Sequence, residues 1–105
     1  MWEFDVPPEA VAAFEEAYGH QGPWVRLFRR DGAYEGTTLL RDRTRPGRYL
    51  TFDYWRTREA FEAFRERFRD EFAAIDASCE RLTARERPLG EFDPLILSTP
   101  GPDDP

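Results

Sequence analysis

Six side chains in the middle of the sequence carry groups that can bind a flat molecule and move a proton. His20 is the only imidazole of the chain, and imidazole is the side chain that most readily gains and loses a proton near neutral pH. Asp53 lies within a predicted strand, where aspartate is depleted. We expect it either to pair with an arginine of a second copy of the chain or to accept a proton if it is desolvated. Four aromatic residues each offer a flat surface and one hydrogen-bond donor: Trp24, Tyr34, Tyr54 and Trp55.

Each of these residues also has a purely structural interpretation. His20 lies in a glycine-containing loop, where an exposed histidine without a role is common. Trp55 ends a predicted strand and can serve as a packing wedge, whereas Trp24 lies in an irregular segment of the kind that often carries function. Tyr34 and Tyr54 can equally be half-buried residues of a sheet with their hydroxyl groups in water.

Short periodic elements must position these groups. At the start of the chain, apolar and acidic residues alternate, which predicts a strand with one buried face. Pro7-Pro8-Glu9 is a typical helix start, and Gly19 can end that helix. The expected elements up to Trp55 are strands at about 2–6, 33–40 and 49–55, a helix at 8–18, a helical turn at 24–28, and an arginine-rich hairpin loop at 41–48 that is either solvated or holds an anion.

The strongest periodic signal is a stripe of apolar residues at steps of three and four: Phe61, Phe64, Phe68, Phe72, Ile75, Cys79 and Leu82. It predicts an amphipathic helix that Thr57 caps and that runs to about residue 81. Such a helix is ~36 Å long, so we expect a break or bend near Asp70 or Asp76. On its polar side, Arg58 with Glu62 and Arg67 with Glu71 are spaced as i,i+4 ion pairs.

The order of elements predicts an α+β fold with the ferredoxin-like split βαβ pattern. A last strand is expected at about 84–92, on an edge of the four-stranded antiparallel sheet because Pro88 cannot donate to a central ladder. Both long helices then cover one face. Within 49–55, apolar side chains project to both faces, so the second face also needs a cover. We therefore predict a homodimer in which two sheets pack face to face.

Composition excludes several classes of protein. The 105 residues suit one domain at 1–92, followed by a flexible tail rich in Pro and Asp at 93–105. A net charge of −6 argues against nucleic acid as a partner. The chain has neither the run of ~20 apolar residues of a membrane span nor a secretory signal, so we expect a cytoplasmic protein. One His and one Cys cannot assemble the usual metal-ligand sets, and no glycine-rich phosphate loop follows a strand, so we expect no metal and no cofactor.

Four stretches together resemble the antibiotic biosynthesis monooxygenase (ABM) domain family. They begin with Tyr18-Gly19-His20-Gln21-Gly22-Pro23-Trp24-Val25-Arg26-Leu27-Phe28-Arg29 and Gly36-Thr37-Thr38-Leu39-Leu40-Arg41-Asp42, and continue with Arg48-Tyr49-Leu50-Thr51-Phe52-Asp53-Tyr54-Trp55 and Glu59-Ala60-Phe61. The resemblance covers about residues 2–92. It implies a dimeric α+β barrel built from two ferredoxin-like subunits.

The resemblance also implies a chemistry. Monooxygenases of this family use neither a metal nor a flavin, and their substrate is deprotonated to an electron-rich anion that reduces O2 itself. Such a reaction needs a dry pocket, a base and donors aimed at the developing negative charge. The candidates for catalysis are His20, Tyr54 and Asp53. The candidates for binding a small apolar or aromatic substrate are Trp24, Tyr34, Trp55, Phe64 and Phe68, although the last two are core residues by default.

The sequence departs from the family pattern in one respect. The best-described monooxygenase type relies on an Asn, and this chain has none. The haem-degrading branch uses an Asn, a Trp on the second helix and an axial His further along that helix. Counted from Trp55, the two helix positions fall about at Phe64 and Ala74, neither of which can do this, so we do not expect haem degradation. Two hypotheses follow: a cofactor-independent monooxygenase acting on a small aromatic or quinol-like substrate, or a non-catalytic small-ligand-binding or stress-response dimer with the same fold.

Overall fold

A computed structural model describes residues 1–95 of the chain. Of the predicted tail at 93–105, residues 96–105 lie outside the described part. No helix within residues 1–95 is long and apolar enough to cross a membrane. The elements follow the predicted order: β1 (Trp2–Asp5), the 3-10 turn η1 (Pro8–Ala10), α1 (Val11–Tyr18), α2 (Pro23–Phe28), β2 (Tyr34–Arg41), β3 (Arg48–Trp55), α3 (Arg58–Arg67), α4 (Arg69–Cys79), the 3-10 turn η2 (Glu80–Leu82) and β4 (Arg85–Pro88).

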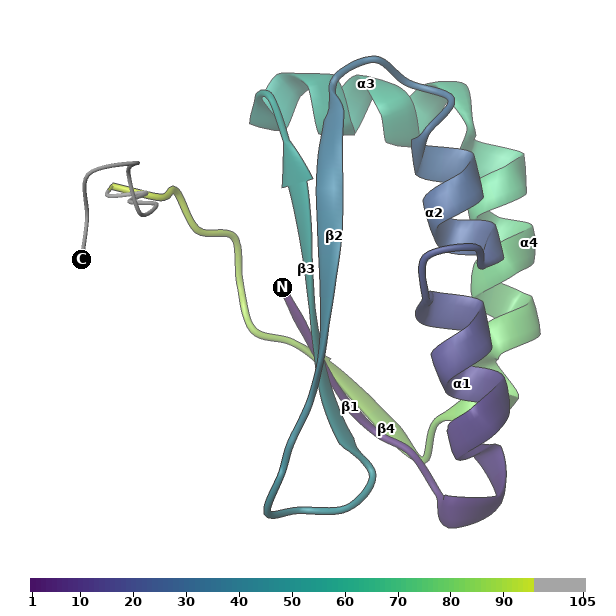
Figure 1. Ribbon diagram of the computed structural model, residues 1–105. Helices are drawn as coiled ribbons and strands as arrows, with labels where there is room; N and C mark the ends of the chain where they lie inside the picture. Colours follow the sequence, from purple (N-terminus) through teal and green to yellow (C-terminus); the bar gives the residue numbers. More distant parts are fainter. Residues whose placement is uncertain (96–105) are drawn as a thin grey trace.

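The strands form one antiparallel sheet in the order β2-β3-β1-β4. Helices α1, α2 and α4 stack along one side of this sheet, and α3 crosses its end (Figure 1). This is the predicted α+β ferredoxin-like fold. Strand β4 lies at an edge, as Pro88 required, but it spans 85–88 and not 84–92. We call the side of the sheet that the helices cover the inner face, and the opposite side the outer face.

The core lies between the helices and the inner face. Phe4 of β1 and Tyr49 of β3 are register partners, and both are buried against Phe14 of α1. A second cluster of buried residues joins α2 to α3 and α4: Trp24, Leu27, Phe28, Phe64, Phe68 and Cys79. The apolar stripe of the sequence is therefore mostly core, as an amphipathic helix requires.

The predicted long helix breaks at Phe68, which has φ −109° and ψ 29° and separates α3 from α4. Thr57 caps α3 as predicted, because its hydroxyl accepts a hydrogen bond from the backbone N–H of Ala60 at 3.0 Å. The break displaces the expected pair of Arg67 and Glu71. The Arg67 guanidinium instead lies 4.5 Å from the centre of the Phe68 ring.

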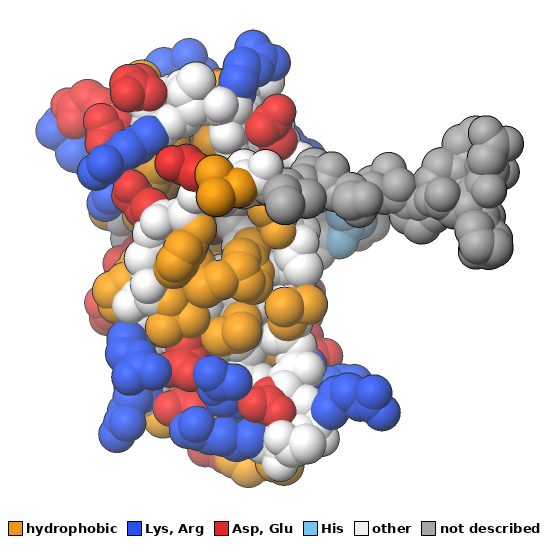
Figure 2. All heavy atoms as spheres, turned by 90° about the vertical axis from the view of Figure 1, so that its left-hand side faces the viewer, with side chains coloured by type: hydrophobic (Ala, Val, Ile, Leu, Met, Phe, Trp, Pro, Cys, Tyr) orange, Lys and Arg blue, Asp and Glu red, His pale blue; other side chains and the backbone are white. Residues whose placement is uncertain are grey.

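The outer face carries an apolar centre (Figure 2). In β3, Leu50, Phe52 and Tyr54 alternate with inner-face residues, and Leu40 of β2 pairs with Leu50. Leu40 and Tyr54 are each 45% exposed, which is unusual for large side chains on one side of a sheet. Figure 2 shows charged side chains above and below this apolar centre. The prediction that apolar side chains project from both faces of this strand is confirmed.

Three of the four arginines of the hairpin loop at 41–48 face carboxylates of the same chain. Arg48 lies 2.6 Å from Glu3 and 3.1 Å from Asp42, and Arg45 lies 3.1 Å from Asp5. These partners neutralise much of the positive charge of the loop. The geometry therefore favours a solvated loop over an anion-binding site.

Candidate functional site

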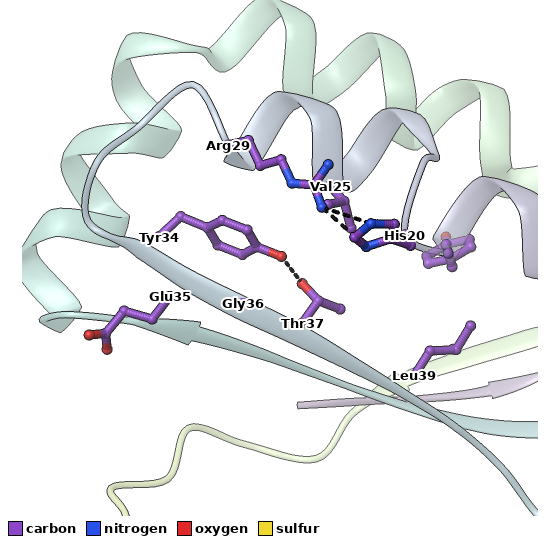
Figure 3. Close-up of a pocket in the computed structure, with 10 residues that line it drawn as sticks. His20, Val25, Arg29, Tyr34, Glu35, Gly36, Thr37 and Leu39 are labelled. Carbon is purple, nitrogen blue, oxygen red and sulfur yellow. Dashed lines mark hydrogen bonds between the residues drawn. The ribbon is translucent and has the colours of Figure 1, made fainter.

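A pocket of about 620 Å³ opens between α2 and β2, on the inner face of the sheet. Val25 of α2 and Arg29, the residue that follows α2, line its wall, and the end of α1 with the following loop supplies three more residues. Figure 3 shows Tyr34 and Thr37 of β2 on the side of the strand that faces α2, whereas the side chain of Glu35 points away from this space. The lining consists of Tyr18, Gly19, His20, Val25, Arg29, Tyr34, Glu35, Gly36, Thr37 and Leu39.

The polar wall of the pocket is a row of hydrogen bonds that crosses from β2 to β3. The Tyr34 hydroxyl lies 2.5 Å from the Thr37 hydroxyl oxygen (Figure 3). The Thr37 hydroxyl donates in turn to Oδ1 of Asp53 at 2.7 Å. Thr37 and Asp53 are register partners in the sheet. The sequence predicts Tyr34 as a ligand contact and Asp53 as a proton acceptor. In the structure, these two residues belong to the same row of hydrogen bonds.

A β-bulge explains how Tyr34 and Thr37 come to share a face. In a regular strand, residues three apart point to opposite faces. Here the register shifts between Tyr34 and Gly36, so that one extra residue of β2 faces Tyr54. Gly36 has φ +136°, a conformation that residues with a side chain rarely adopt. An isolated glycine within a predicted strand is the signal that could have revealed this bulge.

Burial changes the acidity of both ends of this row. Desolvation by neighbouring protein atoms raises the pKa of Asp53, while the hydrogen bond from Thr37 lowers it less. The residue as a whole nevertheless remains exposed, so its carboxylate is crowded and not sealed off. Burial likewise raises the pKa of Tyr34, and the charge of Asp53 adds to this effect. Asp53 is therefore a stronger proton acceptor than an ordinary aspartate, and Tyr34 keeps its own proton in the resting protein.

His20 lies at the rim of the pocket and contacts Arg29. Nη2 of Arg29 lies 3.1 Å from Nδ1 and 3.4 Å from Nε2 of the imidazole (Figure 3). Arginine only donates hydrogen bonds, so Arg29 is the donor in this contact. The side chains of both residues are exposed. Arg29 was not expected from the sequence, where it is one of fifteen arginines without a distinguishing pattern.

Tyr54 does not share this pocket within one chain. It lies on the outer face of β3, next to Asp53 in sequence but on the other side of the sheet. Consecutive strand residues point to opposite faces, so one chain cannot bring both side chains to one substrate. Its place among the candidate catalytic residues stays a prediction that depends on a second copy of the chain.

The remaining predicted ligand contacts lie in the core beside the pocket. None of them lines it, and the buried cluster contains three of them: Trp24, Phe64 and Phe68. Trp55 packs against this cluster and lies 5.5 Å, ring to ring, from Tyr34. The indole N–H groups of Trp24 and Trp55 are buried without a hydrogen-bond partner among the described residues. The packing interpretation fits all four residues, which support the pocket from behind.

Two other features do not form a comparable site. A hollow of about 240 Å³ on the helix surface is lined by the charged residues Glu62, Arg65, Glu66 and Arg69. Such a row of alternating charges is typical of a solvated helix face. Within residues 1–95, no three His, Cys, Asp or Glu side chains cluster in a way that could hold a metal ion.

Comparison with solved structures places the fold. The chain superposes on a candidate antibiotic biosynthesis monooxygenase from Deinococcus radiodurans with a TM-score of 0.63 at 13% identity, covering 90% of this chain and 94% of the other. A similar candidate from Nitrosomonas europaea gives 0.60 at 17% identity, over 82% and 86%. SnoaB, a cofactor-independent oxygenase from Streptomyces nogalater, gives 0.59 at 19% identity, over 90% and 91%. At these identities the likeness concerns the fold.

Sequence comparison assigns the family. No curated protein matches the chain. The model of the antibiotic biosynthesis monooxygenase family matches residues 1–78, which is most of the chain. The element order, the antiparallel sheet and the similar structures agree with this match. The chain belongs to the antibiotic biosynthesis monooxygenase (ABM) family.

Proposed function

We propose that this protein is a monooxygenase that needs no bound cofactor and that oxidises a small aromatic or quinol-like substrate with O2 in the pocket between α2 and β2. The observation that carries the proposal is the composition of the pocket wall. Its space of about 620 Å³ joins the apolar side chains of Val25 and Leu39 to the hydroxyl of Tyr34 and the imidazole of His20. This combination suits a flat molecule with one polar edge. The family and the similarity to SnoaB support the same reaction class.

The proposed reaction balances without an external reductant. A base removes a proton from the substrate, and the resulting anion transfers electrons to O2. For a methylene carbon between two aromatic rings, as in an anthrone, two C–H bonds break and a C=O bond forms. One atom of O2 enters the product and the other leaves as water, so the substrate supplies all the electrons.

The residues of this chain divide the remaining tasks. We propose that Asp53 acts as the proton acceptor behind the pocket wall, since burial raises its pKa. His20 places its imidazole at the rim, and Arg29 beside it places a positive charge where an anionic substrate or reduced oxygen gains stability. Tyr54 can contribute only across an interface between copies.

We further propose that the protein acts as a homodimer whose two outer faces pack against each other. The support is the apolar centre of the outer face, in which Leu40 and Tyr54 are 45% exposed. Covering this centre with a second copy removes apolar surface from water. The cytoplasmic location that the sequence favours stays a prediction.

Oxygen uptake tests the proposed reaction. We expect metal-free protein to consume O2 in the presence of at least one member of a panel of anthrones and hydroxyquinols, faster than boiled protein. His20→Gln should slow this uptake, whereas the control Gln21→Ala, at an exposed neighbouring position, should not. Uptake equal to that of boiled protein across the panel refutes the proposed function. A retained ligand in native mass spectrometry without oxidised product then identifies the non-catalytic binding protein.

A further inference from the structure

The chemistry of the three side chains fixes which group donates and which accepts in the hydrogen bonds from Tyr34 through Thr37 to Asp53. A carboxylate only accepts hydrogen bonds, and a hydroxyl carries one proton. Thr37 donates its hydroxyl proton to Asp53. Tyr34 is therefore the donor, and Thr37 the acceptor, in the hydrogen bond between the two hydroxyl groups. The Tyr34 oxygen therefore keeps its free lone pairs for the pocket. While Asp53 is ionised, the pocket wall offers an acceptor at this point and no donor.

We propose that Tyr34, Thr37 and Asp53 form a proton relay that selects neutral phenols or enols as substrates and takes the hydroxyl proton from them. This inference rests on the proposed function and names the substrate class for it. Tyr34 is the catalytic residue of the relay, because its oxygen touches the substrate hydroxyl. Thr37 and Asp53 are positioning residues that act through Tyr34.

The proton transfer balances over three bonds. The substrate O–H bond breaks, and its proton moves to the oxygen of Tyr34. The proton of Tyr34 moves to Thr37, and the proton of Thr37 moves to Asp53. The result is a substrate anion, a neutral Asp53 and a Tyr34 hydroxyl that now donates to that anion. The net charge of the substrate and the relay together stays the same, because the negative charge moves from Asp53 to the substrate.

The surroundings of the relay suit this exchange. The ring of Tyr34 packs against Phe28 and Trp55, with centroids 5.4 and 5.5 Å away, so its ring is held in place. The positive charge of Arg29, the residue after α2, lowers the pKa of Tyr34, and that of the Met1 ammonium group lowers the pKa of Asp53, both by less than burial raises them. Asp53 remains exposed as a residue, which gives the collected proton a way out to solvent.

The test uses a binding preference that does not depend on turnover. Naphthol has a hydroxyl proton that it can donate, and its methyl ether has none. Naphthol is neutral near pH 7. We expect the parent protein to bind naphthol about tenfold more tightly than the ether, the value of one good hydrogen bond. Thr37→Val keeps the shape but frees the proton of Tyr34, so this preference should vanish or reverse. The matched control Thr38→Val, one residue along β2 with its side chain on the outer face, should keep it.

Each outcome decides the matter. A parent protein that binds both probes equally, or binds neither, overturns the relay, and so does a Thr37→Val variant that keeps the tenfold preference. If the preference depends on Thr37 but no O2 is consumed, the relay stands as a ligand-selecting device and the proposed oxygenase activity fails. If O2 is consumed and Thr37→Val leaves both the preference and the rate unchanged, only the relay fails.

The dependence of kcat/KM on pH distinguishes a role of Asp53 in proton transfer from a purely structural role, which would not change it. The acid limb of kcat/KM should lie at a higher pH than for an ordinary aspartate, because burial raises the pKa of Asp53. Asp53→Asn should remove this limb and lower kcat by roughly 10²-fold. Asp53→Asn and Thr37→Val combined should cost no more than either alone, since the two residues act in series.

Discussion

Replacing Phe64 with alanine tests whether this residue belongs to the hydrophobic core or contacts the ligand. Phe64 is 1% exposed, and its ring centroid lies 4.9 Å from Trp55, 5.1 Å from Phe68 and 5.5 Å from Phe28. Burying a phenylalanine side chain contributes about 1.5–3 kcal/mol, and a well-oriented aromatic pair adds about 0.5–1.5 kcal/mol. Phe64→Ala should therefore lower the free energy of unfolding by about 3–5 kcal/mol, the usual range for such core truncations.

The measurement is urea unfolding followed by circular dichroism at a fixed protein concentration. For a domain of about 100 residues, this loss corresponds to a fall in Tm of about 12 °C or more. The control is Phe92→Ala, since Phe92 is 66% exposed and its loss should cost less than about 0.5 kcal/mol. The folded Phe64→Ala variant should bind naphthol within about twofold of the parent affinity, because Phe64 does not line the pocket.

The opposite pattern would refute this reasoning. If Phe64→Ala unfolds at nearly the parent urea concentration but loses naphthol binding, the ring belongs to the ligand site that the sequence suggested. The aromatic cluster behind the pocket would then be part of the site and not its support.

Three further perturbations test other parts of the structure. The backbone N–H of Thr44 and the guanidinium of Arg48 hold the pKa of Asp42 at about 2, below its ordinary 3.8. Asp42→Asn should therefore be less stable than the parent at pH 7, with the gap closing as the pH falls from about 4 to about 2 in acid unfolding. Phe52→Asp places a charge in the apolar outer face and should convert the expected dimer to a monomer in sedimentation; a parent protein that already sediments at 12.3 kDa contradicts the dimer. Thr57→Ala removes the cap of α3 and should cost about 1 kcal/mol in urea unfolding.

The fold was predictable because its determinants are local. The period of three and four from Phe61 to Leu82 predicts a helix, and the alternation in β3 predicts a strand with two covered faces. Pro88 placed β4 at an edge, where the structure has it. The break at Phe68 lies near the predicted Asp70, but its position depends on how α3 crosses the end of the sheet, which no local pattern encodes.

The site was less predictable because it depends on register. His20, Tyr34 and Asp53 were proposed from residue type alone, since a single imidazole, a tyrosine hydroxyl and an aspartate in the middle of a strand are conspicuous. Thr37 was missed, because three residues separate it from Tyr34 and a regular strand would place the two on opposite faces. The bulge at Gly36 brings them together. The alternation of β3 already implied that Tyr54 and Asp53 face different sides of the sheet.

Oxygen labelling tests the central claim most directly. Metal-free protein is incubated with an anthrone or hydroxyquinol substrate under isotopically heavy O2, and the product is analysed by mass spectrometry. The claim that the pocket between α2 and β2 activates such a substrate for reaction with O2 predicts one heavy oxygen atom per product molecule. It also predicts that Tyr34→Phe, which keeps the ring but lacks the hydroxyl, forms this product far more slowly. Product without heavy oxygen, or equal labelled product from Tyr34→Phe, contradicts the claim.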